Sequence, residues 1–496
     1  MTELFSLMKS LNEEELKAIA ASFRKFNSID SESFLLEQLF IHIVAEKQNI
    51  RTDKQLSLIL YKTEKLSAVA RLKSRLFHFI LEVLSSDSLL QKESLFDASD
   101  KQVIRIRKKM LQFRVIHRKK NRAGMEILLH LLNEITKEAK EYEQYDILVE
   151  GLIFKKYFVM LRKGFSEAEK IEKDIDYYMD VYKMGLRAND HYFNLITNQE
   201  MISKLKPAQK LKVLERSMWE LRKAIDRTQS PSIIYIYKLL ELDYLLSLNK
   251  HIYTIDVCLS IIEHLKKHRH LYRTERIGFM YDNISICQVY NQDFKKAVIS
   301  SQKAQSFYPP NHNSFLPSKQ QEFYACFYSG QYKAANEIIK DLLNFKMSNT
   351  GEFRYDKFLF LNACTLFKLG FYVDALAICN QSLTISQDKS RWDLGVRYLK
   401  FMCQIELTEF DEALKSIEAL RKIISRKKQE VSSRDLVIYG MLNEYRNNAF
   451  HKTVSAKLQG FCKKLAAKGP NAWNYYTHEI IPIHSWLESK NKSLRK

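Results

Sequence analysis

The chain has 496 residues, of which 46% are apolar, 12 are glycine and 7 are proline, and it carries a net charge of +21. Glycine first occurs at Gly124 and proline at Pro207. This scarcity excludes sheets and nucleotide-binding folds from the N-terminal region, because such folds need turn residues at many corners. The positive charge favours an acidic partner, either protein or nucleic acid, without identifying one.

The N-terminus and the cysteines predict a cytoplasmic location. The opening residues, MTELFSLMKSLNEEEL, have no basic stretch followed by an apolar one, as a secretory signal would. No run approaches the roughly 18 apolar residues of a membrane span. The seven cysteines form no CxxC pair, which favours free thiols in a reducing compartment, buried as small apolar side chains on helix faces.

Residues 1–95 form the first predicted domain, a compact helical module. Its clearest local pattern is LNEEEL, residues 11–16. Asn12 can accept from the third helical N–H, Glu15 can reach back to Asn12, and Leu11 can pack on Leu16. We therefore expect a helix to begin at about residue 13.

Residues 96–274 continue as long amphipathic helices, which we interpret as degenerate helical-hairpin repeats. Gly164, Phe165 and Ala168 resemble the repeats that follow but are out of phase with them. The stretch RIRKKMLQFRVIHRKKNR, residues 105–122, has nine Lys or Arg and no acid. A basic helix face of this kind can lie along phosphates, but apolar residues at helical spacing within it are also what a solvated amphipathic helix shows.

Residues 275–465 carry a recurring pair in which an aromatic residue lies three positions before a small one. The pairs are Phe294/Ala297, Tyr332/Ala335, Tyr372/Ala375, Phe410/Ala413 and, more weakly, Phe450/Thr453, so that the small residues are 38 to 40 positions apart. Each pair follows a residue suited to ending a helix: Gln292, Gly330, Gly370, Thr408 or Asn448. Beyond them, residues 466–496 read as one or two C-terminal capping helices and a basic tail.

The recurring pairs, which we call the ladder, predict antiparallel helix hairpins. The small residue lies one turn into the second helix, on the face that meets the first, where axes roughly 8–10 Å apart leave little room. The aromatic side chain fills the wedge at the open end of the hairpin. The predicted fold is all-α: an α-solenoid of stacked hairpins that follows the N-terminal helical module.

The ladder resembles the second half of the tetratricopeptide repeat (TPR), which reads Gly-x-Tyr-x-x-Ala followed by apolar positions. The best match is Gly370, Tyr372, Ala375, Leu376 and Ser382, preceded by Leu359, Ala363 and Leu366 in the first helix. The usual repeat has about 34 residues, and armadillo or HEAT repeats, at about 40–47, are the rival class, although they do not predict the aromatic-to-alanine spacing. The opening ELFSLMKSLNEEELKAIAASFRKF is also similar to uncharacterised bacterial proteins that carry a helical module before TPR-like repeats.

The TPR resemblance implies a concave groove, lined by the first helices, that binds an extended peptide or a partner helix. Carrying over its phase places eight residues in this groove: Tyr290, Tyr324, Tyr328, Lys357, Lys368, Tyr398, Tyr445 and Arg446. Tyrosines beside cationic side chains suit a peptide with an acidic group, but the same tyrosines can be half-buried packing residues. The Lys/Asn clamp of chaperone-tail-binding members is absent, since those positions hold residues such as Phe360 and Cys364.

Other candidate sites are weak. His264, His268 and His270 have a metal-like spacing, but neighbouring Lys and Arg repel a cation. Asp174, Asp176 and Asp180 lack the glycine and terminal Glu of a calcium loop. The chain has no GxxxxGK[ST], GxGxxG or GxSxG motif, so we expect no metal, no cofactor and no enzymatic activity.

Two functions are therefore compared below. The first is a non-enzymatic scaffold or adaptor that binds a peptide or helix of a protein partner in the concave groove of the solenoid. The alternative is a regulator of the peptide-sensing TPR type that contacts nucleic acid through its basic N-terminal half. Such regulators start with a helix-turn-helix, which the N-terminal residues of this sequence do not show.

Overall fold

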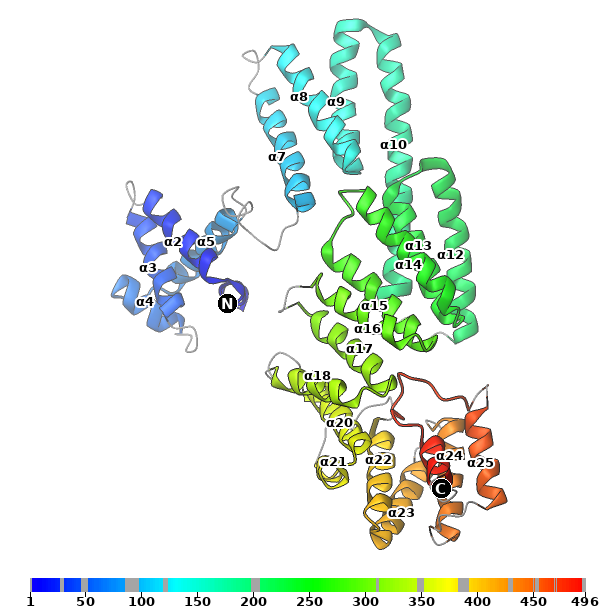
Figure 1. Cartoon of the computed structure of the whole chain (residues 1–496). Helices are drawn as coiled ribbons and strands as arrows, with labels where there is room; N and C mark the ends of the chain where they lie inside the picture. The colour runs from blue at the N-terminus through cyan, green and yellow to red at the C-terminus, as the bar shows by residue number, and fades with distance from the viewer. Residues whose placement is uncertain are drawn as a thin grey trace. The chain divides into compact units, whose positions relative to one another are not determined.

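The computed structural model describes residues 2–26, 31–45, 52–84, 98–118, 124–197, 206–308, 312–345, 352–381, 392–426, 431–448, 450, 455–467, 469 and 471–492. Every regular element in these ranges is helical, as predicted (Figure 1). The chain divides into two compact units, residues 1–182 and 183–496. No helix in the described part combines the length and hydropathy needed to span a bilayer. The finer predicted boundaries at residues 95, 274 and 465 remain predictions.

The first unit opens with five helices around one apolar core. They are α1 (Thr2–Ser10), α2 (Glu13–Phe26), α3 (Ser31–Ala45), α4 (Asp53–Tyr61) and α5 (Leu66–Leu84). Ile19, Leu39 and Leu76 are fully buried in this core. The predicted capping box is confirmed: the Asn12 N–H donates to Glu15 Oε2 at 2.7 Å, and the Glu15 N–H donates to Asn12 Oδ1 at 2.9 Å.

The next helices are α7 (Ala98–Arg118), α8 (Met125–Glu141), α9 (Tyr145–Lys163) and α10 (Phe165–Tyr192). Phe113, Leu132 and Phe158 belong to their shared core. The α8–α9 turn contains Glu143 in the left-handed conformation, with a φ of 51°. Gly164 joins α9 directly to α10 with a φ of 87°.

The second unit contains the remaining elements. They are η1 (Phe193–Thr197), α12 (Pro207–Thr228), α13 (Pro231–Ser247), α14 (His251–Lys267), α15 (Thr274–Tyr290), α16 (Phe294–Gln305), α17 (Phe315–Tyr328), α18 (Tyr332–Asn344), α20 (Glu352–Leu369), α21 (Tyr372–Cys379), α22 (Trp392–Glu406), α23 (Phe410–Arg426), α24 (Ser433–Asn447), α25 (Ala456–Ala466) and α26 (Ile483–Lys492). From α12 to α25, each helix packs against the next one along the chain. First helices of successive hairpins also touch, α15 against α17 and α20 against α22, as in a solenoid.

The ladder has the predicted structural role. Ala297, Ala335, Ala375 and Ala413 all lie near the start of second helices and have 0% exposure. In the first of these hairpins the Ser285 hydroxyl of α15 donates to the Ala297 carbonyl at 2.8 Å, so the two helices approach closely. A side chain larger than alanine has no space between helices at this separation.

The hairpins also share one turn geometry. The residue that ends the first helix is left-handed in four of them: Gln292, Gly330, Gly370 and Thr408, with φ values of 63°, 81°, 87° and 62°. The N–H of the following residue then donates to a carbonyl five positions back, as from Phe371 to Leu366 at 2.9 Å and from Glu409 to Gln404 at 2.8 Å. This closure terminates the first helix and starts the second within a few residues.

One member of the pattern differs from the sequence prediction. Phe450 does not begin a second helix, because it is itself the left-handed turn residue, with a φ of 57°, and α25 begins only at Ala456. Its ring is buried against Tyr445 and Phe410, so the side chain packs beneath the turn. Thr453, like Ser382, lies outside the described residues.

The turn recurs upstream, where the sequence pattern was not readable. Asn249 is left-handed, with a φ of 54°, and the Lys250 N–H donates to the Leu245 carbonyl at 3.0 Å. His251 and the buried Thr254 then occupy the aromatic and small positions of the ladder. The seven cysteines are free and buried, as predicted.

Candidate functional site

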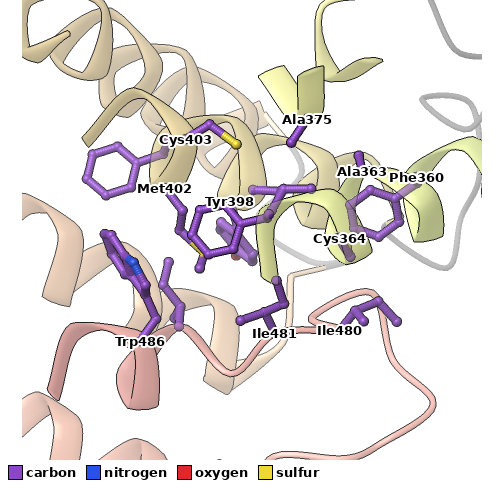
Figure 2. Packing of buried hydrophobic residues seen from close by; sticks show 14 of the residues in the cluster. Phe360, Ala363, Cys364, Ala375, Tyr398, Met402, Cys403, Ile480, Ile481 and Trp486 are labelled. Carbon is purple, nitrogen blue, oxygen red and sulfur yellow. The ribbon is translucent and has the colours of Figure 1, made fainter. Parts of the chain in front are cut away.

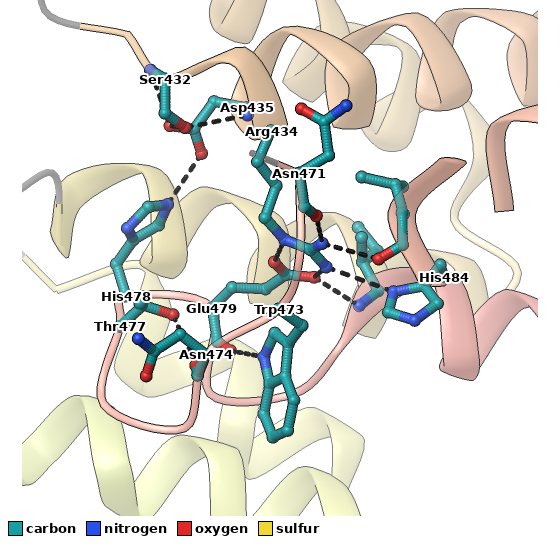
Figure 3. A network of polar contacts seen from close by, with 12 residues as sticks. Ser432, Arg434, Asp435, Asn471, Trp473, Asn474, Thr477, His478, Glu479 and His484 are labelled. Carbon is teal, nitrogen blue, oxygen red and sulfur yellow. Dashed lines mark hydrogen bonds and ion pairs between the residues drawn. The ribbon is translucent and has the colours of Figure 1, made fainter. Parts of the chain in front are cut away.

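The first helices α15, α17, α22 and α24 carry the side chains that meet the end of the chain. We call this set the first-helix face, and we call residues Asn471–Leu487 the C-terminal segment. This segment is non-helical from Asn471 to Pro482 and then enters α26. We expected one or two capping helices here; the structure has one, preceded by a stretch whose side chains bind the first-helix face (Figure 3).

Tyr290, at the end of α15, contacts the tip of the C-terminal segment. Its hydroxyl donates to Asn474 Oδ1 at 2.8 Å. Its ring centroid lies 5.9 Å from that of Tyr475 and 5.5 Å from that of Tyr476, and the His251 ring stacks on it at 4.3 Å. Burial raises the pKa of the Tyr290 hydroxyl, so it remains a donor.

Two tyrosines of α17 complete the aromatic contact. The buried Tyr324 meets the Tyr476 ring edge-on at 5.0 Å. The Tyr328 hydroxyl donates to the main-chain carbonyl of Tyr475, and its ring lies 5.5 Å from the Trp473 ring. Three of the predicted groove tyrosines therefore come together, with a segment of the same chain between them.

Asp435 of α24 is the centre of a polar contact further along. It is 1% exposed and accepts from the Tyr398 hydroxyl at 3.1 Å and from His478 Nε2 at 2.8 Å. It also caps its own helix, since its second oxygen accepts from the Ser432 N–H at 3.2 Å and its own N–H donates to the Ser432 hydroxyl at 3.2 Å. Burial and the nearby Asp435 carboxylate raise the pKa of Tyr398 well above its usual value.

Arg434 joins α24 to the C-terminal segment through several hydrogen bonds (Figure 3). Its guanidinium donates to both oxygens of Glu479, Nε at 2.5 Å and Nη2 at 3.0 Å. It also donates to the carbonyls of Leu465, at 2.9 Å, and Asn471. Because Arg434 and Glu479 are both buried, each compensates a charge that would otherwise be costly to bury.

The same carboxylate starts the last helix. Glu479 Oε1 accepts from the Ile483 N–H at 2.9 Å. Next to it, His484 Nδ1 accepts from Arg434 Nη2 at 3.3 Å. Burial, together with the positive charge of Arg434, lowers the pKa of His484 to about 4, so this imidazole is neutral at pH 7.

Apolar side chains of the C-terminal segment join the repeat core. Figure 2 shows Ile480, Ile481 and Trp486 among core residues of α20 and α22. Trp486 Nε1 donates to Glu406 at 2.7 Å. On α22, a Cβ at Gly395 would collide with the carbonyl oxygen of His478, so only glycine lets the segment backbone approach this helix.

The other predicted groove residues contact neighbouring repeat helices or their turns. Lys357 lies over the Trp392 ring at 4.4 Å, and Lys368 lies 6.0 Å from the Tyr332 ring, with its pKa lowered by burial. Tyr445 is buried against Phe450, and Arg446 pairs with Glu418 at 2.9 Å. These four residues and the tyrosines of α15 and α17 thus do not form one continuous set of segment contacts in the described structure.

Sequence reasoning missed five residues of the contact between the first-helix face and the C-terminal segment: Arg434, Asp435, Trp473, His478 and Glu479. Only the composition of NAWNYYTHEIIP, aromatic and polar without helical spacing and ended by Pro482, distinguished this stretch from the helices before it.

The remaining candidates from the sequence make ordinary structural contacts. On α7, Arg107 pairs with Asp146 at 3.0 Å, Lys109 with Glu138 at 2.7 Å, and Arg114 with Glu150 at 2.5 Å. His264 Nε2 lies 2.9 Å from the Pro231 carbonyl. Within the described ranges, no three His, Cys, Asp or Glu side chains are grouped to hold a metal ion.

Comparisons with known proteins give distant structural similarity. No protein-family model and no curated protein matches the sequence. The chain is similar to a Signal Transduction ATPase with Numerous Domains (STAND) protein with a tetratricopeptide repeat sensor from Pyrococcus horikoshii, with 13% identity, a TM-score of 0.40, and 87% of this chain and 68% of that chain covered. It is also similar to the TPR2AB-domain:pHSP90 complex of yeast Sti1, with 14% identity, a TM-score of 0.21, and 53% and 97% covered.

The hairpins themselves define the class of protein. The chain has an all-α, TPR-like helical repeat fold, in which buried alanines and left-handed turns recur from one hairpin to the next. It differs from a simple array in one respect: part of the face made by its first helices binds the C-terminal segment of the same chain.

Proposed function

We propose that this protein is a non-enzymatic scaffold that binds a non-helical segment of a protein partner on the first-helix face. One observation carries the proposal: this face already holds a non-helical segment with turns and bends, residues 471–482 of the same chain. A surface that binds one such segment has the donors and apolar area to bind another of similar chemistry.

The chemistry of the contacts suits peptide recognition. Tyr328 donates to a main-chain carbonyl, which any residue supplies. Tyr290 and Tyr324 offer rigid aromatic area at low cost in side-chain entropy. Arg434 and Asp435 add one positive and one negative group, which fix the direction and register of the bound segment.

The ionisable groups on this face support binding in preference to catalysis. Asp435 accepts hydrogen bonds from Tyr398, His478 and Ser432, and such an acceptor is poorly placed to take a proton from a substrate. On the neighbouring helix α20, burial raises the pKa of the Cys364 thiol well above its usual value, which removes the thiolate that a nucleophilic cysteine needs.

The nucleic-acid alternative has less support. Arg107, Lys109 and Arg114, in the centre of the basic helix α7, each pair with a carboxylate of α8 or α9. These pairs lower the positive potential that would attract phosphates. Residues 119–122 lie outside the described residues.

Exchange of the C-terminal segment tests the proposed function. A protease site inserted beside the exposed Gly469 would allow the chain to be cut after folding, with all residues still present. We expect the cut chain to release its own segment and take up a labelled peptide of residues 471–490, measured by fluorescence anisotropy. If the cut chain keeps its segment and takes up no peptide, the first-helix face is a closed part of the core and the proposal is wrong.

A further inference from the structure

The C-terminal segment fits the first-helix face incompletely. Among the described residues, the buried hydroxyl of Tyr476 and the buried Oδ1 of Asn471 have no hydrogen-bond partner. A buried polar atom without a partner weakens binding, because it loses its contact with water and gains nothing in return. A competing segment that lacks these two atoms, or pairs them, would bind more tightly.

Arg434 sets the main requirement on any competitor. Its side chain is buried and is compensated by one carboxylate, Glu479, which lies on the departing segment. Loss of the segment without replacement would remove Glu479 and the Asn471 carbonyl together and leave the guanidinium with the Leu465 carbonyl, at 2.9 Å. A segment that displaces residues 471–487 must therefore supply a carboxylate at this point.

Asp435 sets a second requirement one residue earlier. Its Oδ1 accepts from His478 of the segment, while the Tyr398 and Ser432 hydroxyls are donors that remain when the segment leaves. An incoming segment must place a hydrogen-bond donor here, since an acidic or apolar side chain would leave the Asp435 carboxylate short of a partner. The tyrosines of α15 and α17 meanwhile accept two adjacent aromatic rings, Tyr475 and Tyr476.

We propose that the first-helix face is specific for a non-helical partner segment in which two adjacent aromatic residues are followed, two and three positions after the second one, by a hydrogen-bond donor and a carboxylate. The carboxylate binds Arg434, the donor binds Asp435, and the aromatic pair packs on Tyr290, Tyr324 and Tyr328. The C-terminal segment competes with the partner for this site. The inference rests on the proposed function and adds the chemistry of the partner.

The test uses the cut chain and a set of competing peptides of residues 471–490. We expect the Glu479→Gln peptide to compete at least about 100-fold less well than the natural peptide, because it leaves Arg434 without a carboxylate. The Glu488→Gln peptide is the matched control, since Glu488 is exposed, and it should compete like the natural one. A Tyr476→Phe peptide, which removes the unpaired hydroxyl, should compete equally or better.

A fifth peptide that keeps only the aromatic pair, His478 and Glu479, with serine elsewhere, should still compete measurably. Equal competition by the Glu479→Gln and Glu488→Gln peptides would overturn the inference while leaving the proposed function intact, because exchange would still occur. No exchange with any peptide would instead reject the proposed function.

The intact chain provides a second measurement that does not depend on cutting. Glu479→Gln in the full chain weakens the resident segment, so added natural peptide should bind at least about tenfold more tightly than to the unmodified chain. Glu488→Gln in the full chain should leave this affinity unchanged. Equal affinities for the two variants would contradict competition at Arg434.

Discussion

The hairpin interior and the C-terminal segment bury their residues in opposite ways. The hairpins repeat one solution, a small side chain between two close helices, at Ala297, Ala335, Ala375 and Ala413. The contacts of the C-terminal segment follow no repeat. They combine buried charges, tyrosine hydroxyls and a close approach of the segment backbone to Gly395 of α22. The difference indicates that the hairpins provide stability by many similar contacts, whereas the segment depends on a few specific ones.

The largest expected effect comes from a substitution that removes a contact of the C-terminal segment. Arg434→Leu leaves the Glu479 carboxylate buried without its partner and should lower the free energy of unfolding by about 3–5 kcal/mol. Urea denaturation followed by tryptophan fluorescence measures it, since Trp473 and Trp486 lie in the segment. Arg421→Leu, at an exposed residue paired with Glu418, is the control and should change stability by less than about 0.5 kcal/mol. Similar losses from both would contradict the role assigned to Arg434.

The pH dependence of stability should differ between the C-terminal segment and the hairpin interior. His484 of the segment has its pKa lowered to about 4, so its contribution is present above pH 6.5 and is lost as pH falls towards 4. Asp282 of the α15 hairpin, buried beside the Tyr308 and Ser318 hydroxyls, has its pKa raised to about 6, so its contribution is lost as pH rises from about 4 through 6. Each effect corresponds to about 3 kcal/mol, and the two oppose each other.

Single variants should reveal these opposing slopes. Asp282→Asn should make stability rise more steeply with pH between 4 and 6.5, and His484→Gln should make it fall, as measured by urea midpoints across this range. The unmodified chain should show a flatter profile than either variant. If both variants retain the unmodified profile, neither group titrates as described.

The hairpin interior is tested by a matched pair of neighbouring residues on α18. Ala335→Leu places a larger side chain between two helices and should cost about 1–3 kcal/mol of unfolding free energy. Ala334→Leu makes the same chemical change on the exposed side of the helix and should change it by less than about 0.5 kcal/mol. Thermal or urea denaturation compares the two. A larger loss at Ala334 would reverse the assigned packing face.

The smallest expected effect concerns the shared turns. An added Cβ at Gly370 meets no atom within 4 Å, so Gly370→Ala tests the left-handed backbone alone and should cost about 1 kcal/mol. Thr408, which has a φ of 62° in the equivalent turn, should gain up to about 1 kcal/mol on replacement by glycine. Opposite signs in urea denaturation support a common turn geometry, and equal signs contradict it.

Much of the fold could be predicted because its determinants are local or repeated. Asn12 and Glu15 are three positions apart and cap α2 as expected. The ladder was readable where the small position held alanine, and it was lost upstream because Thr254 and a histidine, His251, occupy the same positions. The α13–α14 hairpin is equivalent to the later ones because of the left-handed turn at Asn249, which the residue types alone do not reveal.

Only the repeat-helix part of the candidate site could be predicted from the sequence, and the C-terminal segment that contacts it could not. The repeat phase placed Tyr290, Tyr324 and Tyr328 on a binding face, and the structure brings them together. The residues that fill this face lie far away in sequence: Asn474 is 184 positions from Tyr290, and Glu479 is 45 positions from Arg434. A single pairing at such separations leaves no periodic trace, so only coordinates reveal it.

The sequence separation of the Arg434–Glu479 pair also has a consequence for synthesis. During translation, residues of α24 are synthesised before residue 479. Arg434 is therefore present for a time without the Glu479 carboxylate. During that interval the nascent protein presents its tyrosines and its guanidinium to the surroundings. A partner present at translation would therefore meet the site without a rival, and its binding would be decided by timing as well as by affinity.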